Sequence, residues 1–90
     1  MNAASGSPFL VRVHVMLRPS ILDPQGKAVG AALSALGFSA VQGVRMGKEV
    51  ELRVEARSEE EARRIGEEAA RRLLANPVME DFRVETERVP

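Results

Sequence analysis

The chain has 90 residues, with 13 basic and 13 acidic side chains and no cysteine. The balanced charge provides no bulk attraction to nucleic acid or to an anionic membrane, and the lack of thiols excludes disulfides and thiolate metal sites. A chain of this length forms one domain and buries only about 60% of the surface that its unfolded form exposes, so we expect a stabilising partner.

The N-terminal segment, residues 1–8, is dominated by small and polar residues and is expected to be a disordered tail before a single domain at residues 9–90. It lacks the basic patch and apolar core of a secretory signal. No later apolar run approaches the ~20 residues that span a bilayer. We therefore expect a cytoplasmic protein without a membrane partner.

The first structured element is predicted to be a strand from Phe9 to Leu17, because apolar residues alternate there with other side chains. A helix is predicted to follow. Asp23 is a suitable N-cap, Pro24 suits the first helical position, and Gly37 suits the helix end. The expected apolar stripe of this helix comprises Ala28, Val29, Ala32, Leu33 and Leu36.

The remaining face of this helix carries no charge, and Lys27 is the only charged residue from Pro24 to Leu36. A helix face that contacts water normally carries charged side chains, so we expect a second copy of the chain to cover this one. The expected dimer interface consists of Gly30, Ala31, Ser34 and Ala35.

Two further strands are expected at residues 41–46 and 49–55, joined by a hairpin turn near Gly47. A two-residue turn would direct an arginine to the apolar face of the later strand. We favour a three-residue loop, because it places Val44 and Met46 on that face instead.

Ser58 followed by Glu61 is a capping box that opens a second helix, and Asn76 before Pro77 ends it, because the residue before a proline is pushed out of the α region. A last strand is expected at about residues 82–86. The expected inner stripe of the second helix is Ala62, Ile65, Ala69 and Leu73. Acid-before-base pairs spaced i,i+4 predict a solvated outer face, namely Glu59/Arg63, Glu60/Arg64, Glu67/Arg71 and Glu68/Arg72.

This order of elements, βαββαβ, predicts an α+β domain with a ferredoxin-like antiparallel sheet and two helices on one of its faces. Domains of this fold perform many functions, so the fold by itself specifies none.

Side chains suited to catalysis are scarce. His14 is the only histidine, it lies on the strand face away from the helices, and the local sequence places no carboxylate or nucleophile beside it. One histidine without cysteine does not assemble a metal site. The three phenylalanines fall at core positions, and no tyrosine or tryptophan is available to stack on bases. We therefore expect no catalytic, cofactor-binding or metal-binding residue and no nucleic-acid partner.

Three short stretches of the chain carry a resemblance to a known family. Their residues are Asp23, Pro24, Gln25 and Gly26, then Arg45, Gly47 and Lys48, then Leu74, Ala75, Asn76, Pro77, Val78 and Glu80. With these residues, the chain from about residue 9 to 86 resembles the PurS-type small subunit of phosphoribosylformylglycinamidine synthase. The resemblance implies a non-catalytic subunit that bridges a glutaminase and an ATP-dependent synthetase and assists ammonia transfer in purine biosynthesis. Phe82 stands where a tyrosine is common in that family.

The resemblance also implies partners. These are the glutaminase subunit, the large synthetase subunit and further copies of the chain in a dimer or tetramer. The complex uses ATP, Mg²⁺ and glutamine, whereas no cofactor is expected in this chain. A glycine in the first turn of a helix costs roughly 0.5–1 kcal/mol relative to alanine, so Gly26 suggests that a partner backbone approaches closely there. Partner contacts are expected at Asp23, Gln25, Gly26, Arg45, Gly47, Lys48, Asn76 and Pro77.

Two other functions fit the same pattern. One is a small dimeric regulatory domain of the βαββαβ type that binds an amino acid or a nucleotide at its interface. The other is a structural dimerisation module without a metabolic role. A stable complex with the two synthase subunits would separate the family function from both.

Overall fold

The computed structural model describes residues 6–90. In chain order the elements are β1 (Ser7–Leu17), α1 (Pro24–Ala35), β2 (Gly47–Ala56), α2 (Glu59–Ala69) with its π-helical continuation η2 (Ala70–Leu74), and β3 (Glu80–Arg88). Residues 1–5 of the predicted tail lie outside the described part of the chain. Ser7 and Pro8, also assigned to that tail, already belong to β1.

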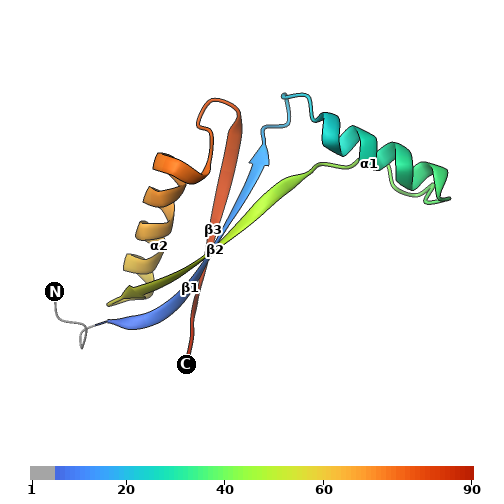
Figure 1. Ribbon diagram of the computed structural model, residues 1–90. Helices are drawn as coiled ribbons and strands as arrows, with labels where there is room; N and C mark the ends of the chain where they lie inside the picture. Colours follow the sequence, from blue (N-terminus) through green and yellow to red (C-terminus); the bar gives the residue numbers. More distant parts are fainter. Residues whose placement is uncertain (1–5) are drawn as a thin grey trace.

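The three strands form one antiparallel sheet in the order β2-β1-β3, and α2 lies across one of its faces (Figure 1). The central strand β1 pairs with both neighbours, so that Val13 lies opposite Val50 on one side and Val84 on the other. The predicted α+β class, with an antiparallel sheet and two helices, is confirmed. The buried core consists of Phe9, Val11, Val13, Val15, Ala56, Ala62, Ala70, Ala75 and Val84.

The strand predicted at residues 41–46 does not form within the chain, so the predicted hairpin and its register are wrong. These residues instead follow α1 back toward the sheet (Figure 1). The backbone N–H of Met46 donates to the Asp23 carboxylate at 2.8 Å, and the Val44 side chain lies against Gly30. Contacts with α1 therefore hold the backbone that the prediction paired with the next strand.

Helix α1 projects beyond the end of the sheet, whereas α2 alone covers the sheet face (Figure 1). Gly26 is the only buried residue of α1. The stripe predicted to face the sheet therefore covers no strand, and Leu36 at the end of the helix is 73% exposed. The radius of gyration is 17.1 Å. A compact domain of this length would have about 12 Å, so the projecting helix makes the single chain unusually extended.

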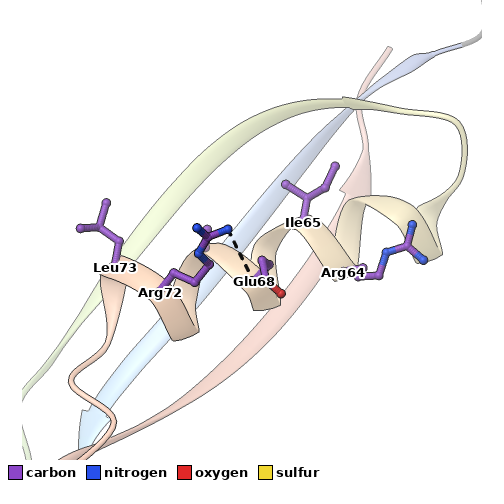
Figure 2. Close-up of a pocket in the computed structure, with 6 residues that line it drawn as sticks. Arg64, Ile65, Glu68, Arg72 and Leu73 are labelled. Atoms are coloured by element: carbon purple, nitrogen blue, oxygen red, sulfur yellow. Dashed lines mark ion pairs between the residues drawn. The ribbon is translucent and has the colours of Figure 1, made fainter. Parts of the chain in front are cut away.

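Helix α2 buries only part of the predicted inner stripe, because Ala62 is buried but Ile65 and Leu73 are not. Small residues spaced four apart, Ala62, Gly66 and Ala70, contact the sheet. A Cβ atom on Gly66 would lie only 2.5 Å from a methyl carbon of Val11, so the helix packs too close to β1 for larger side chains. Ile65 and Leu73, which the prediction placed inside, are 39% and 83% exposed (Figure 2).

The predicted capping box is present. The Ser58 hydroxyl accepts from the N–H of Glu61 at 3.1 Å, and the Glu61 carboxylate accepts from the N–H of Arg57 at 2.8 Å. Of the predicted i,i+4 ion pairs, Glu68–Arg72 forms at 3.9 Å. Arg63, which was expected to pair with Glu59, donates instead to the Val84 carbonyl on β3 at 2.8 Å. Gly37 ends α1 with a positive φ of 95°, as predicted.

Candidate partner-binding site

The residues predicted to bind partners gather at one end of the sheet. The β1–α1 connection, the start of β2 and the α2–β3 loop meet there, since Met16 pairs with Gly47 and the N–H of Arg18 donates to the Met79 carbonyl at 2.9 Å. The predicted residues form two groups at this end. One group contains Asp23, Gln25, Gly26, Arg45, Gly47 and Lys48, and the other contains Asn76 and Pro77.

Asp23 joins α1 to the start of β2. One carboxylate oxygen accepts from the N–H of Gly26 at 2.9 Å, which caps the helix, and the other accepts from the N–H of Met46 at 2.8 Å. These two hydrogen bonds, with the nearby positive charge of Arg45, hold the pKa of Asp23 below its ordinary value. Both oxygens are used within the chain, so Asp23 orients the helix.

Gly26 and Gly47 are explained by contacts inside the chain. A Cβ atom on Gly26 would lie 2.6 Å from the carbonyl oxygen of Val44, so the close backbone approach expected from a partner is made by the chain's own segment. A Cβ atom on Gly47 would collide with the backbone of Val15. Both glycines therefore permit local packing.

Arg45, Gln25 and Lys48 are exposed at this end of the sheet. Arg45 donates a hydrogen bond to the Leu17 carbonyl and thereby stays against β1. Arg45 and Lys48 were expected at the tip of a hairpin. They instead flank the point where the extended segment enters β2. Gln25 and Lys48 line a shallow hollow beside Val15, Leu17, Asp23, Met46, Gly47 and Glu80.

Asn76 and Pro77 shape the loop that follows η2. The Asn76 side-chain oxygen accepts from the N–H of Val78 at 2.9 Å, and its backbone N–H donates to the Glu80 carboxylate at 2.7 Å. The Pro77 carbonyl accepts from Arg18 at 2.6 Å. The polar groups of Asn76 thus maintain a turn.

The same loop exposes two apolar side chains that were not among the expected partner contacts, Val78 at 74% and Met79 at 41%. Their position directly after Pro77, outside any predicted strand or helix, was the available signal. No local pattern indicated Arg18, which makes an ion pair with Asp81 at 3.2 Å.

His14 lies on the sheet face that α2 does not cover. Its two ring nitrogens lie 3.2 Å from Glu49 on β2 and 3.1 Å from Glu85 on β3, and the hydrogen bond from His14 is the main cause that lowers the pKa of Glu85. Arg12 makes a similar contact with Glu87 at 3.0 Å. The sheet register therefore supplies carboxylates that the local sequence did not, and they form a ladder of charges across the strands.

Of the residues predicted at a dimer interface, Ala31, Ser34 and Ala35 are exposed. Gly30 faces Val44 of the same chain, because a Cβ atom there would lie 3.6 Å from a methyl carbon of that valine. Within residues 6–90, no group of three or more histidine, aspartate or glutamate side chains is arranged to hold a metal ion. In the same part of the chain, no helix is both long and apolar enough to cross a membrane.

Residues 10–88 match a family model described as PurS, phosphoribosylformylglycinamidine (FGAM) synthase. The chain is 44% identical over 81 residues to the phosphoribosylformylglycinamidine synthase subunit PurS of Bacillus subtilis, covering 90% of this chain and 95% of that protein. Thermus thermophilus PurS superposes with a TM-score of 0.84 at 37% identity and covers 92% of this chain and 99% of its own. A chain from the structure of PurLQS from Thermotoga maritima gives a TM-score of 0.82 at 32% identity, over 89% and 98% of the two chains. The chain therefore belongs to the PurS family.

Proposed function

We propose that this protein is the small subunit of phosphoribosylformylglycinamidine synthase, a glutamine-dependent C–N ligase complex of purine biosynthesis. The observation that carries the proposal is the 44% identity to a PurS subunit over nearly the full length of both chains. The likeness to a chain of the Thermotoga maritima PurLQS structure supports assembly with a glutaminase and a synthetase subunit. Such a complex works in the cytoplasm.

The role proposed for the subunit is to bridge the two larger subunits and assist ammonia transfer, without catalytic residues of its own. The geometry of the site supports a role in positioning the other subunits, without a catalytic step in this chain. Each oxygen of the Asp23 carboxylate accepts a hydrogen bond from a backbone N–H group, and the Asn76 side chain accepts one within its own turn. ATP, Mg²⁺ and glutamine are then handled by the other subunits.

The contact surface proposed for those subunits is the end of the sheet where the two groups of residues meet. Gln25 and Lys48 offer polar contacts there, and Val78 and Met79 offer an apolar one. Exposed loop residues on a rigid scaffold are well placed for recognition.

The protein is also proposed to pair with itself. Helix α1 has no sheet to cover within the chain, and it leaves Leu36 and Phe38 73% and 54% exposed. Burial of such side chains contributes about 1.5–3 kcal/mol each, which gives a second copy a clear driving force for association.

Reconstitution tests the subunit assignment. The chain is added to the matching glutaminase and synthetase subunits, and formation of the amidine is measured with glutamine or with free ammonia as the nitrogen source. Because a bridging subunit supplies assembly and delivery, we expect the glutamine-dependent rate to require this chain and the ammonia-dependent rate to change far less. If both rates ignore the chain, the assignment is wrong.

A further inference from the structure

The sheet face that α2 leaves uncovered has the only histidine of the chain near its middle. His14 stands on the central strand β1, and its ring lies between carboxylates from both edge strands. Nδ1 lies 3.2 Å from a carboxylate oxygen of Glu49 on β2, and Nε2 lies 3.1 Å from one of Glu85 on β3. The His14 side chain is only 23% exposed. One partly enclosed ring therefore contacts all three strands.

The two contacts of the ring are both favourable in only one protonation state. A neutral imidazole has one N–H donor and one bare nitrogen, whereas an imidazolium has two donors, and an ionised carboxylate can only accept. In the neutral ring, one nitrogen would direct its lone pair at a carboxylate oxygen. When the ring is protonated, His14 donates to Glu49 and to Glu85, and each hydrogen bond is also an ion pair.

Acidic side chains outnumber basic ones around the ring. The charged groups that face it are Arg12 on β1, Glu49 and Glu51 on β2, and Asp81, Arg83, Glu85 and Glu87 on β3. Asp81 pairs with Arg18, which leaves four carboxylates against two guanidinium groups. Both guanidinium groups already contact carboxylates, since Arg12 lies 3.0 Å from Glu87 and Arg83 lies 3.7 Å from Glu85. The excess of negative charge favours a proton on the imidazole ring.

The ring also lies close behind the partner-binding end of the sheet. Met16 and Leu17, just beyond His14 on β1, pair with Gly47 at the start of β2 and Glu80 at the start of β3. Within residues 6–90, each edge strand has β1 as its only neighbour in the sheet. How firmly the two strand starts are held in place therefore depends on their contacts with β1.

We infer that His14 is a proton-dependent clamp, which ties both edge strands to β1 when its ring is protonated and loses one of these ties when the ring is neutral. The clamp lets the folded chain hold the ring proton more tightly than the unfolded chain does. Its stabilisation is therefore present where the ring is charged and is lost as the pH rises through the range in which histidine titrates. The inference goes beyond the proposed function, because it concerns the sheet of a single chain.

Replacing His14 with glutamine tests the clamp, because glutamine keeps a donor and an acceptor but cannot carry a charge. Thermal unfolding of both chains is followed by circular dichroism at one protein concentration, at about pH 5.5 and about pH 8.5. The lower value lies above the ordinary pKa of a glutamate side chain, about 4.3, so the carboxylates remain ionised. We expect the unmodified chain to exceed His14→Gln in melting temperature by about 2–5 °C more at the lower pH than at the higher one. An equal difference at both pH values would overturn the inference.

Variants of the neighbouring residues show whether the ring contacts are responsible. Glu49→Gln and Glu85→Gln each remove one carboxylate from the ring, so the melting temperature of each variant should fall less between the two pH values than that of the unmodified chain. Arg12→Gln is the matched control, because it removes an ion pair of the same face whose guanidinium stays charged throughout. This variant should keep the full pH-dependent fall. If Arg12→Gln reduced the fall as much as Glu49→Gln does, the overall charge of the face would be responsible and the clamp would be wrong.

Nuclear magnetic resonance of the unmodified chain gives a second test that needs no substitution. With one histidine in the chain, a sample labelled with ¹⁵N-histidine gives the signals of a single ring. At about pH 7, where a free imidazole is mostly neutral, we expect the ring to be doubly protonated in a larger fraction of folded chains than of chains unfolded in urea. An equal or smaller fraction in the folded chain would overturn the clamp.

Discussion

Replacing Gly66 with alanine tests how closely α2 approaches the sheet. The new Cβ atom would lie 2.5 Å from one methyl carbon of Val11 and 3.3 Å from one of Val84. Val11 is fully buried in the central strand, where both neighbouring strands hold it, and rotation about χ1 is restricted in a β-branched side chain. The clash therefore has to be relieved by moving the helix or the strand.

Two opposing effects set the magnitude. Alanine is a better helix former than glycine by about 0.8–1 kcal/mol. Adding a methyl group to a tightly packed core costs about 1–3 kcal/mol, and the rigid neighbour places Gly66→Ala toward the upper end. We expect a net loss of about 1–2 kcal/mol in the free energy of unfolding. For a domain of this size that loss corresponds to a melting temperature lower by roughly 5–15 °C.

Thermal unfolding followed by circular dichroism at one fixed protein concentration measures the effect, because association makes the melting temperature concentration-dependent. Gly30→Ala is the matched control. Its Cβ atom would lie 3.6 Å from Val44, an ordinary contact, so this variant should gain up to about 1 kcal/mol from helix propensity. If Gly66→Ala melted at or above the unmodified chain, the helix would lie farther from β1 than the structure shows.

Three further predictions concern the base of α1, the dimer and the partner surface. Hydrogen bonds from the N–H groups of Met46 and Gly26 lower the pKa of Asp23 in the folded state. The ionised carboxylate therefore stabilises the fold fully above the pKa that Asp23 has in the unfolded chain, about 3.9, and this stabilisation is lost as the pH falls through the lower pKa of the folded state. Asp23→Asn should therefore lower the melting temperature at pH 7, and the melting temperature of the variant should decrease less steeply below about pH 4. If the melting temperatures of both proteins decreased equally steeply in acid, this reasoning would be contradicted. Ala31→Glu, on the exposed side of α1, should shift sedimentation toward the monomer, because a carboxylate at the contact would lose its water without gaining a partner, and an unaltered dimer would remove Ala31 from the interface. The double variant Gln25→Ala, Lys48→Ala should lower the glutamine-dependent rate of the reconstituted synthase at least about fivefold and the ammonia-dependent rate far less. The control is the double variant Arg53→Ala, Arg88→Ala, toward the other end of the sheet, which should leave both rates near their original values.

The sequence alone was sufficient to predict those features that depend on one short stretch of the chain. The alternation from Phe9 to Leu17 identified β1, because a strand with one buried face needs apolar residues at every second position. The caps at Asp23 and Ser58 were equally readable, since each side chain binds the backbone of its own first turn. The family motifs were readable for the same reason, as they are contiguous in the chain.

The tertiary structure decided every question that depends on distance between elements. Hydrophobicity favoured Ile65 and Leu73 for the inner face of α2, but the narrow space above Val11 admits only Gly66 and alanines, and no pattern within the helix encodes that space. The register of the sheet places the carboxylates of Glu49 and Glu85 beside His14, although these residues are far from it in the sequence. The segment at residues 41–46 has the composition of a strand, yet a strand forms only where an edge is within reach. Asp23 holds the backbone of this segment beside α1, so within one chain the segment pairs with no strand.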